Sequence, residues 1–136
     1  MIKQKFEITS RPWTVYVYYN YNAKNINDVI DTLNNLYFPK YYVTRAYSIL
    51  SKSAKNSGFT YTNLYTKTTL IVITQATNFS QFINSLIHEI FHLITHIAKR
   101  YDISFDNEEL CYLAGDIAQR TYTFSHRYIS KYYKDI

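Results

Sequence analysis

Two histidines and one glutamate in a short segment have the types and the spacing of a catalytic metal site. Residues 88–92 read H-E-I-F-H, which matches the pattern H-E-x-x-H. Side chains four residues apart lie on the same face of a helix, so the imidazoles of His88 and His92 can bind one metal ion. Glu89 is then placed to take a proton from a metal-activated water, as a general base does. The segment therefore predicts a metal centre, and zinc suits these ligands.

An ordinary amphipathic helix can also contain this pattern, because so short a motif occurs by chance in many sequences. The distribution of the residues argues against chance. Three of the four histidines and three of the four glutamates of the chain lie between His88 and Glu109. A solvent-exposed helix face has no reason to concentrate these residues, so we favour a metal site over a merely polar face.

A catalytic zinc ion needs a third protein ligand besides the two histidines. Glu108 and Glu109 begin a later helical segment, and either carboxylate can supply that ligand. His96 is a competing candidate, but on a straight helix it lies about 12 Å from His88, too far to share the ion. Helical geometry alone leaves Glu108 and Glu109 as alternatives.

The motif lies in a segment whose apolar periodicity predicts a long helix over residues 79–100, capped by Asn78 or Ser80. An apolar segment, residues 68–74, directly precedes this helix and is predicted to be a central strand. The helix is expected to end at a turn over residues 102–106. The strand and the cap together would fix the position of the motif.

The remaining segments predict further strands and helices. Pro39 is expected to end one helix, and Gly58 to stop the next. The expected strands are residues 13–19 and 59–64, and the expected helices run from about residue 26 to Pro39, over 41–55, from Asp106 or Asn107 through Ile117, and over 125–133. This order predicts an α+β fold in which a small antiparallel sheet packs on helices.

Length and composition predict a single domain over residues 1–136. The formal charge of +5 comes from scattered basic residues without a dense run, so we do not expect a nucleic-acid partner.

The chain has a single cysteine, Cys111, so an internal disulfide is excluded, which suits a reducing cytoplasm. We expect the side chain of Cys111 to be buried. The sequence has neither a signal-peptide pattern nor a membrane-spanning apolar run, so we expect neither secretion nor membrane insertion.

From about Asn78 to Arg120 the chain resembles the small phage- and prophage-encoded metallopeptidase-like proteins of gluzincin type. These proteins combine an H-E-x-x-H helix with a downstream helix that reads roughly E-x-x-A-Y-L-x-G. Residues 108–115 read E-E-L-C-Y-L-A-G, in which Cys111 replaces the small alanine. The resemblance implies a zincin-like fold in which the motif helix follows an apolar strand. It also implies that Glu108 is the third zinc ligand.

The function implied by this resemblance is that of a zinc metallopeptidase, a hydrolase that cleaves a peptide or protein substrate. His88, His92 and Glu108 would hold Zn²⁺, with Glu109 as the alternate third ligand, and Glu89 would be the general base. The protein would act in the host-cell cytoplasm or be attached to the virion. The alternative is a catalytically silent zinc-binding protein with a structural or regulatory role. A basic nucleic-acid-binding domain is the less favoured third interpretation.

Overall fold

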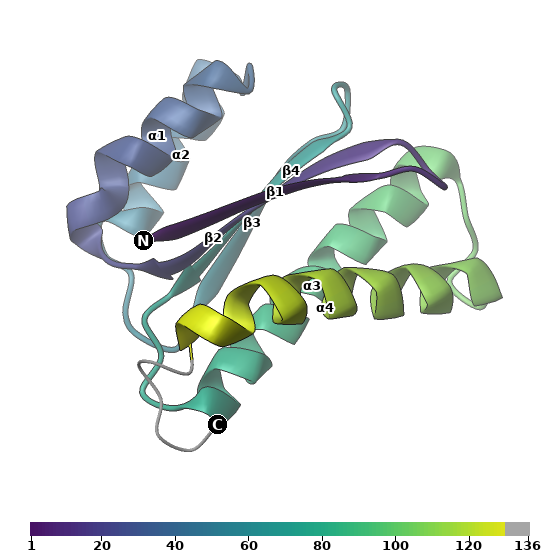
Figure 1. The fold of residues 1–136 in the computed structure, drawn as a ribbon. Coiled ribbons are helices and arrows are strands. Elements are labelled where there is room, and N and C mark those ends of the chain that lie inside the picture. The colour runs from purple at the N-terminus through teal and green to yellow at the C-terminus, as the bar shows by residue number, and fades with distance from the viewer. Residues whose placement is uncertain (130–136) are drawn as a thin grey trace.

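The computed structural model describes residues 1–129 and shows an α+β fold in which helices cover a four-stranded sheet (Figure 1). The predicted α+β class is therefore confirmed, whereas the zincin-like arrangement stays a prediction. In chain order the elements are β1 (Ile2–Ile8), β2 (Trp13–Tyr21), a short 3-10 helix η1 (Ala23–Asn25), α1 (Ile26–Asn35), α2 (Lys40–Leu50), β3 (Gly58–Asn63), β4 (Thr68–Thr74), α3 (Phe79–Tyr101) and α4 (Glu108–Ile129).

The strands lie side by side in the order β1-β2-β4-β3. β1 pairs with β2 and β3 pairs with β4 in antiparallel register, but β2 and β4 run parallel. The sheet is therefore mixed, and the expected antiparallel arrangement is wrong for its central pair. The reason is the connection, because α1, α2 and β3 lie between β2 and β4 and provide the long crossover that parallel neighbours need. β3 is left at one edge of the sheet.

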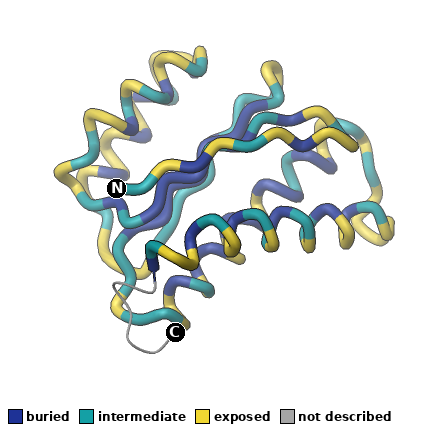
Figure 2. Tube along the Cα trace, viewed as in Figure 1, coloured by how far each residue is buried: buried dark blue, intermediate teal, exposed yellow. Residues whose placement is uncertain are grey.

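Helices cover both faces of the sheet: α1 and α2 pack on one face, and α3 and α4 on the other (Figure 1). Successive residues of a strand point to opposite faces, so each central strand contributes to both cores. Ile71 packs with α3 and α4, whereas Leu70 and Val72 pack with α1 and α2. Every residue of β4 is buried, as expected for a central strand between two helical layers (Figure 2).

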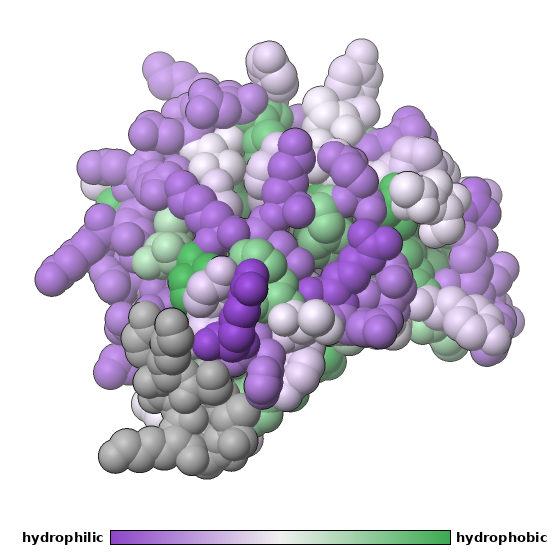
Figure 3. Space-filling view, viewed as in Figure 1, coloured by the Kyte–Doolittle hydropathy of each residue, from purple (hydrophilic) through white to green (hydrophobic). Residues whose placement is uncertain are grey.

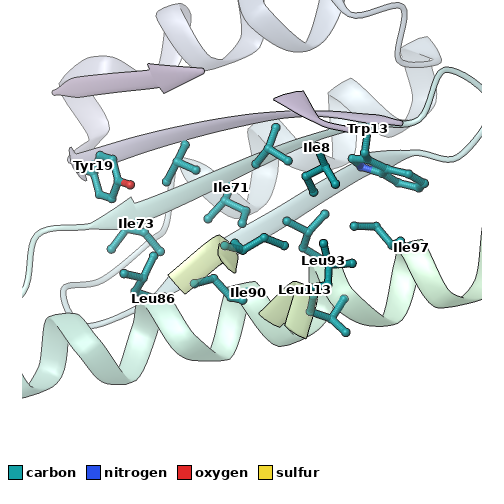
Figure 4. Close-up of a cluster of buried hydrophobic side chains, with 14 of the residues drawn as sticks. Ile8, Trp13, Tyr19, Ile71, Ile73, Leu86, Ile90, Leu93, Ile97 and Leu113 are labelled. Carbon is teal, nitrogen blue, oxygen red and sulfur yellow. The ribbon is translucent and has the colours of Figure 1, made fainter. Parts of the chain in front are cut away.

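α3, the helix that contains the motif, turns an apolar side to the sheet. Leu86, Ile90, Leu93 and Ile97, spaced three and four residues apart, belong to one buried cluster with Ile71 and other strand residues (Figure 4). This spacing sets the rotation of α3 about its own axis. Residues between these positions must then face solvent or the edge of the sheet.

The two ends of α3 are defined by local interactions. The Asn78 side chain accepts a hydrogen bond from the backbone N–H of Gln81, which confirms the predicted cap. At the other end Asp102 adopts the left-handed conformation, with φ of 54°, and the helix ends. The observed helix, Phe79–Tyr101, extends one residue beyond the predicted span.

Five local expectations differ from the structure. The helix expected to run to Pro39 ends at Asn35, and Pro39 is the N-cap of α2 instead. The N-terminal strand β1 was not expected, and α2 ends at Leu50, so Gly58 does not stop a helix and begins β3 instead. α4 is one continuous helix through Ile129, and residues 130–133 of the last expected helix lie outside the described residues. Cys111 is exposed and not buried, because its position on α4 faces away from the core.

The molecular face seen in Figure 1 is covered mainly by hydrophilic side chains, with small apolar areas between them (Figure 3). Within residues 1–129, none of the helices has both the length and the apolar composition of a membrane span.

The packing of α3 on the sheet predicts that Ile97→Ala lowers the free energy of unfolding by about 3 kcal/mol, because it leaves a cavity in the core. Ile97 is 0 % exposed. Urea denaturation measures the change. Ile49→Ala is the matched control, since Ile49 also lies in a helix but is 42 % exposed, and it should lose about 1 kcal/mol or less. Equal losses in the two variants would contradict the observed position of α3.

Candidate metal centre

The two motif histidines lie together on the exposed side of α3. The Nε2 atoms of His88 and His92 are 3.2 Å apart, a distance that a hydrogen bond between two neutral rings can also produce. A tetrahedral zinc ion keeps two nitrogen ligands about 3.3–3.4 Å apart when each lies 2.0–2.1 Å from the metal. The observed separation therefore fits two ligands of one zinc ion with almost no movement.

Glu89 lies beside the histidines but points inward. Its side chain is 5 % exposed, and its Oε2 atom is 3.7 Å from Nε2 of His88. One ligand atom from each of His88, Glu89 and His92 lies within 4.8 Å of the others. Within residues 1–129, these three side chains form the group whose ligand atoms lie close enough together to hold a metal ion.

Thr60, on the edge strand β3, holds the Glu89 carboxylate. Its hydroxyl oxygen is 2.9 Å from Oε1 of Glu89 and donates a hydrogen bond to it. Oε2 remains free to face the histidines. Because a buried carboxylate without a donor is strongly destabilising, this hydrogen bond stabilises the inward position of Glu89.

Gly58 makes room for Glu89 at the start of β3. A Cβ atom at position 58 would lie 2.7 Å from Cγ of Glu89, closer than two carbon atoms can approach. Sequence reasoning missed both Gly58 and Thr60 as parts of this site. An isolated glycine in a strand often marks a close approach of another group, and this was the available signal for Gly58.

A surface hollow gives access to the buried carboxylate. It is lined by the loop before β3, by Gly58 and by α3 residues Asn84, Ser85, His88 and Glu89. Most of the residues that line the hollow are polar, so a water molecule or a polar group can reach Glu89 from solvent beside His88. The geometry thus combines two exposed imidazoles with a buried carboxylate that is still accessible.

His96 does not join the group and instead belongs to a hydrogen-bonded chain through the core. Its Nδ1 is 2.7 Å from the hydroxyl of Thr62, which is 2.7 Å from the hydroxyl of Thr69. Trp13 Nε1 donates to the same Thr69 oxygen at 2.9 Å. Burial lowers the pKa of His96, and His92 and Lys99 lower it further. A neutral His96 ring can accept the Thr62 hydrogen bond at Nδ1.

The two candidate third ligands lie elsewhere. Glu109 forms a two-point ion pair with Arg11, with contacts of 2.6 and 3.0 Å, and the guanidinium lowers the pKa of its carboxyl group. Glu108 is exposed in the first turn of α4. Neither joins His88 and His92. The third-ligand role of Glu108, with Glu109 as alternate, therefore stays a prediction. The positions of the two carboxylates in the fold do not support it.

The packing of α4 explains this separation. Leu110 and Ala114 of α4 meet Ile90 and Ile94 of α3, on the side away from β3. Glu89, in contrast, meets β3 through Thr60. A carboxylate in the first turn of α4 would have to cross the outer surface of α3 to reach the two histidines.

The close fit between Gly58 and Glu89 predicts that Gly58→Ala destabilises the fold by about 1–3 kcal/mol, because the added methyl group overlaps Glu89. Combining it with Glu89→Ala should remove most of that loss, and a double-mutant cycle by urea denaturation measures the coupling. Gly115→Ala is the control, because nothing lies within 4 Å of a Cβ there and alanine favours the helix. Additive losses at positions 58 and 89 would contradict the contact.

The Arg11–Glu109 ion pair predicts a pH-dependent effect of Glu109→Gln. Because the folded pKa of Glu109 lies below its ordinary value of 4.5, the pair stabilises the fold above that pH. The stabilisation disappears as the pH falls through the lower folded pKa. Thermal midpoints of wild type and Glu109→Gln should therefore differ at neutral pH and converge in acid. Glu108→Gln serves as the neighbouring control, and a gap that widens in acid would contradict the assignment.

Comparison with known proteins found no matching family model, no matching curated protein and no matching solved structure. The resemblance to gluzincin-type phage proteins accordingly remains an expectation that depends on the two motifs alone.

Proposed function

We propose that the protein is a zinc-dependent metallopeptidase of gluzincin type, in which His88 and His92 bind Zn²⁺ and Glu89 is the general base. The observation that carries the proposal is the 3.2 Å separation of the two Nε2 atoms beside a buried carboxylate. The H-E-x-x-H pattern supports the same chemistry. Peptides or proteins are the proposed substrates, in the host cytoplasm or at the virion if the chain is phage-encoded.

The chemistry of the donor atoms favours zinc over the alkaline-earth ions. Imidazole nitrogens are common zinc ligands, whereas calcium and magnesium prefer sets of oxygen ligands. The two imidazoles of His88 and His92 therefore suit a transition metal. When bound, zinc would supply Lewis acidity, which lowers the pKa of a water molecule toward 7 and polarises a carbonyl group.

Glu89 has the position that a general base requires. Thr60 donates to Oε1, which leaves Oε2 free to accept a proton at the side of His88. The carboxylate can then return that proton to the leaving amine of the substrate. Because Glu89 is largely shielded from bulk water, its charge acts strongly on groups that enter the hollow.

The edge strand offers a way to bind an extended peptide next to Glu89. Within residues 1–129, β3 pairs with β4 alone, so its other edge has no strand partner. An extended peptide can add to such an edge through backbone hydrogen bonds, with little demand on its side chains. This arrangement would bring a peptide bond alongside Thr60 and the site.

A second candidate function is zinc binding without turnover. The observation that favours it is the distance of both α4 glutamates from the histidines, since a catalytic zinc site normally has three protein ligands. Such a protein would use the metal for structure or regulation.

Nucleic-acid binding is less favoured, because several basic side chains form ion pairs with acidic side chains of the same chain. These pairs are Lys3–Asp28, Arg11–Glu109 and Arg120–Asp116.

The zinc assignment and the role of Glu89 predict different outcomes for two variants. His92→Ala should lose zinc binding, measured by calorimetric titration, because it removes one of the two nitrogen ligands. Glu89→Gln should keep zinc but lower the cleavage rate of a peptide library by about 10²–10⁴-fold, because the amide cannot accept the proton. His126→Ala, a change at an exposed histidine outside the site, is the control.

Undiminished cleavage by zinc-loaded Glu89→Gln would exclude Glu89 as the base. Zinc binding without cleavage by the wild-type protein would favour the second candidate function. If zinc neither binds nor raises the melting temperature, both candidate functions are wrong.

A further inference from the structure

The exposed side of α3 presents two parallel rows of side chains, one of metal ligands and one apolar. His88 and His92 form the first row. Ile87 and Phe91 form the second row beside it and are 48 % and 63 % exposed. Large apolar side chains at this exposure next to an exposed ligand pair are characteristic of a contact surface.

The apolar row continues onto the neighbouring helix. Ile87 and Phe91 border an apolar groove between α3 and α4 that also includes Cys111 and Ala114. Phe105, at the end of this groove, is 64 % exposed. The groove and the two exposed side chains of α3 form one apolar surface directly beside the histidines, which we call the α3 surface.

The α3 surface is uncharged, although the chain carries a formal charge of +5. Between Phe79 and Ala98 the helix contains no Asp, Lys or Arg, and its one Glu, Glu89, is buried. In a two-fold symmetric interface the residues next to the axis lie near their own copies, so formal charges at the centre repel each other. A neutral centre with apolar side chains suits a second copy of the same chain.

The metal site is also incomplete within one chain. His88 and His92 supply two nitrogen ligands, Glu89 is assigned above as the general base, and the described acidic residues of α4 do not join this group. Structural zinc has four protein ligands in a tetrahedral arrangement. A two-fold axis through the ion would supply the two missing nitrogens from the same pair of residues in the second copy.

We propose that Zn²⁺ joins two copies of this chain, with His88 and His92 of each copy as its four ligands and Ile87 and Phe91 packed across the two-fold axis. The inference rests on the zinc binding proposed above and adds a regulation of that site. In the dimer the four histidines fill the ligand positions of the ion. The dimer is therefore a closed form, and hydrolysis belongs to single chains that carry zinc.

Mass and metal content test this dimer directly. Light scattering after gel filtration should show a zinc-free mass of 16.2 kDa, and twice that mass after zinc chloride is added. Metal analysis of the dimer should give one zinc per two chains, and X-ray absorption should show four nitrogen neighbours. A chelator should return the protein to the smaller mass.

Variants separate the roles of the ligands and of the apolar contact. His92→Ala should remain at the smaller mass with zinc. Phe91→Lys should keep zinc binding but raise the protein concentration needed for dimerisation by at least about tenfold, because it places like charges face to face. Tyr65→Lys is the matched control, since Tyr65 is an aromatic residue with 92 % exposure on the β3–β4 turn and should not affect the dimer.

The outcomes distinguish this inference from the zinc proposal. A protein that binds one zinc per chain and keeps the mass of a monomer overturns the dimer and leaves the zinc proposal intact. A zinc-dependent dimer that persists in His92→Ala, or that Phe91→Lys leaves unchanged, also overturns it. A protein that binds no zinc overturns both.

Discussion

The contact of α3 with the edge strand β3 determines the chemistry of this molecule. Glu89 is buried against β3 because Gly58 has no side chain and Thr60 donates a hydrogen bond to the carboxylate. With Glu89 turned inward, the helical repeat places His88 and His92 at the solvent. A rotation of α3 by one residue, about 100°, would expose the carboxylate in one direction and bury both imidazoles in the other. The apolar side of the helix resists that rotation, because it would leave the sheet.

The parts of the fold that follow from local sequence could be predicted, and those that depend on distant pairing could not. The β-branched run of β4 and the Asn78 cap of α3 act within a few residues. β1 was missed because Gln4, a polar residue at an inward position, interrupts the alternation of apolar and charged residues that indicates a strand. That glutamine is buried because its amide oxygen accepts a hydrogen bond from the hydroxyl of Tyr19. The parallel pairing of β2 and β4 depends on the path of the whole connection between them.

The same distinction holds for the site. The separation of His88 and His92 follows from four-residue spacing on one helix, so the sequence predicts it well. The position of Glu108 depends on how α4 packs as a whole, and no local pattern contains that information. Arg11, which lies 98 residues before Glu109, binds that glutamate in the folded chain. A partner so far away in the sequence can be found only in three dimensions.

The chain of hydrogen bonds from Trp13 through Thr69 and Thr62 to His96 has a mechanical consequence. Apolar contacts between a helix and a sheet tolerate small sliding movements, because they have no direction, whereas hydrogen bonds do not. These hydrogen bonds link three strands of the sheet to α3, so they resist sliding of the helix along its own axis. His96 lies one turn beyond His92 on α3, so the same hydrogen bonds hold the two motif histidines at a constant position along the sheet.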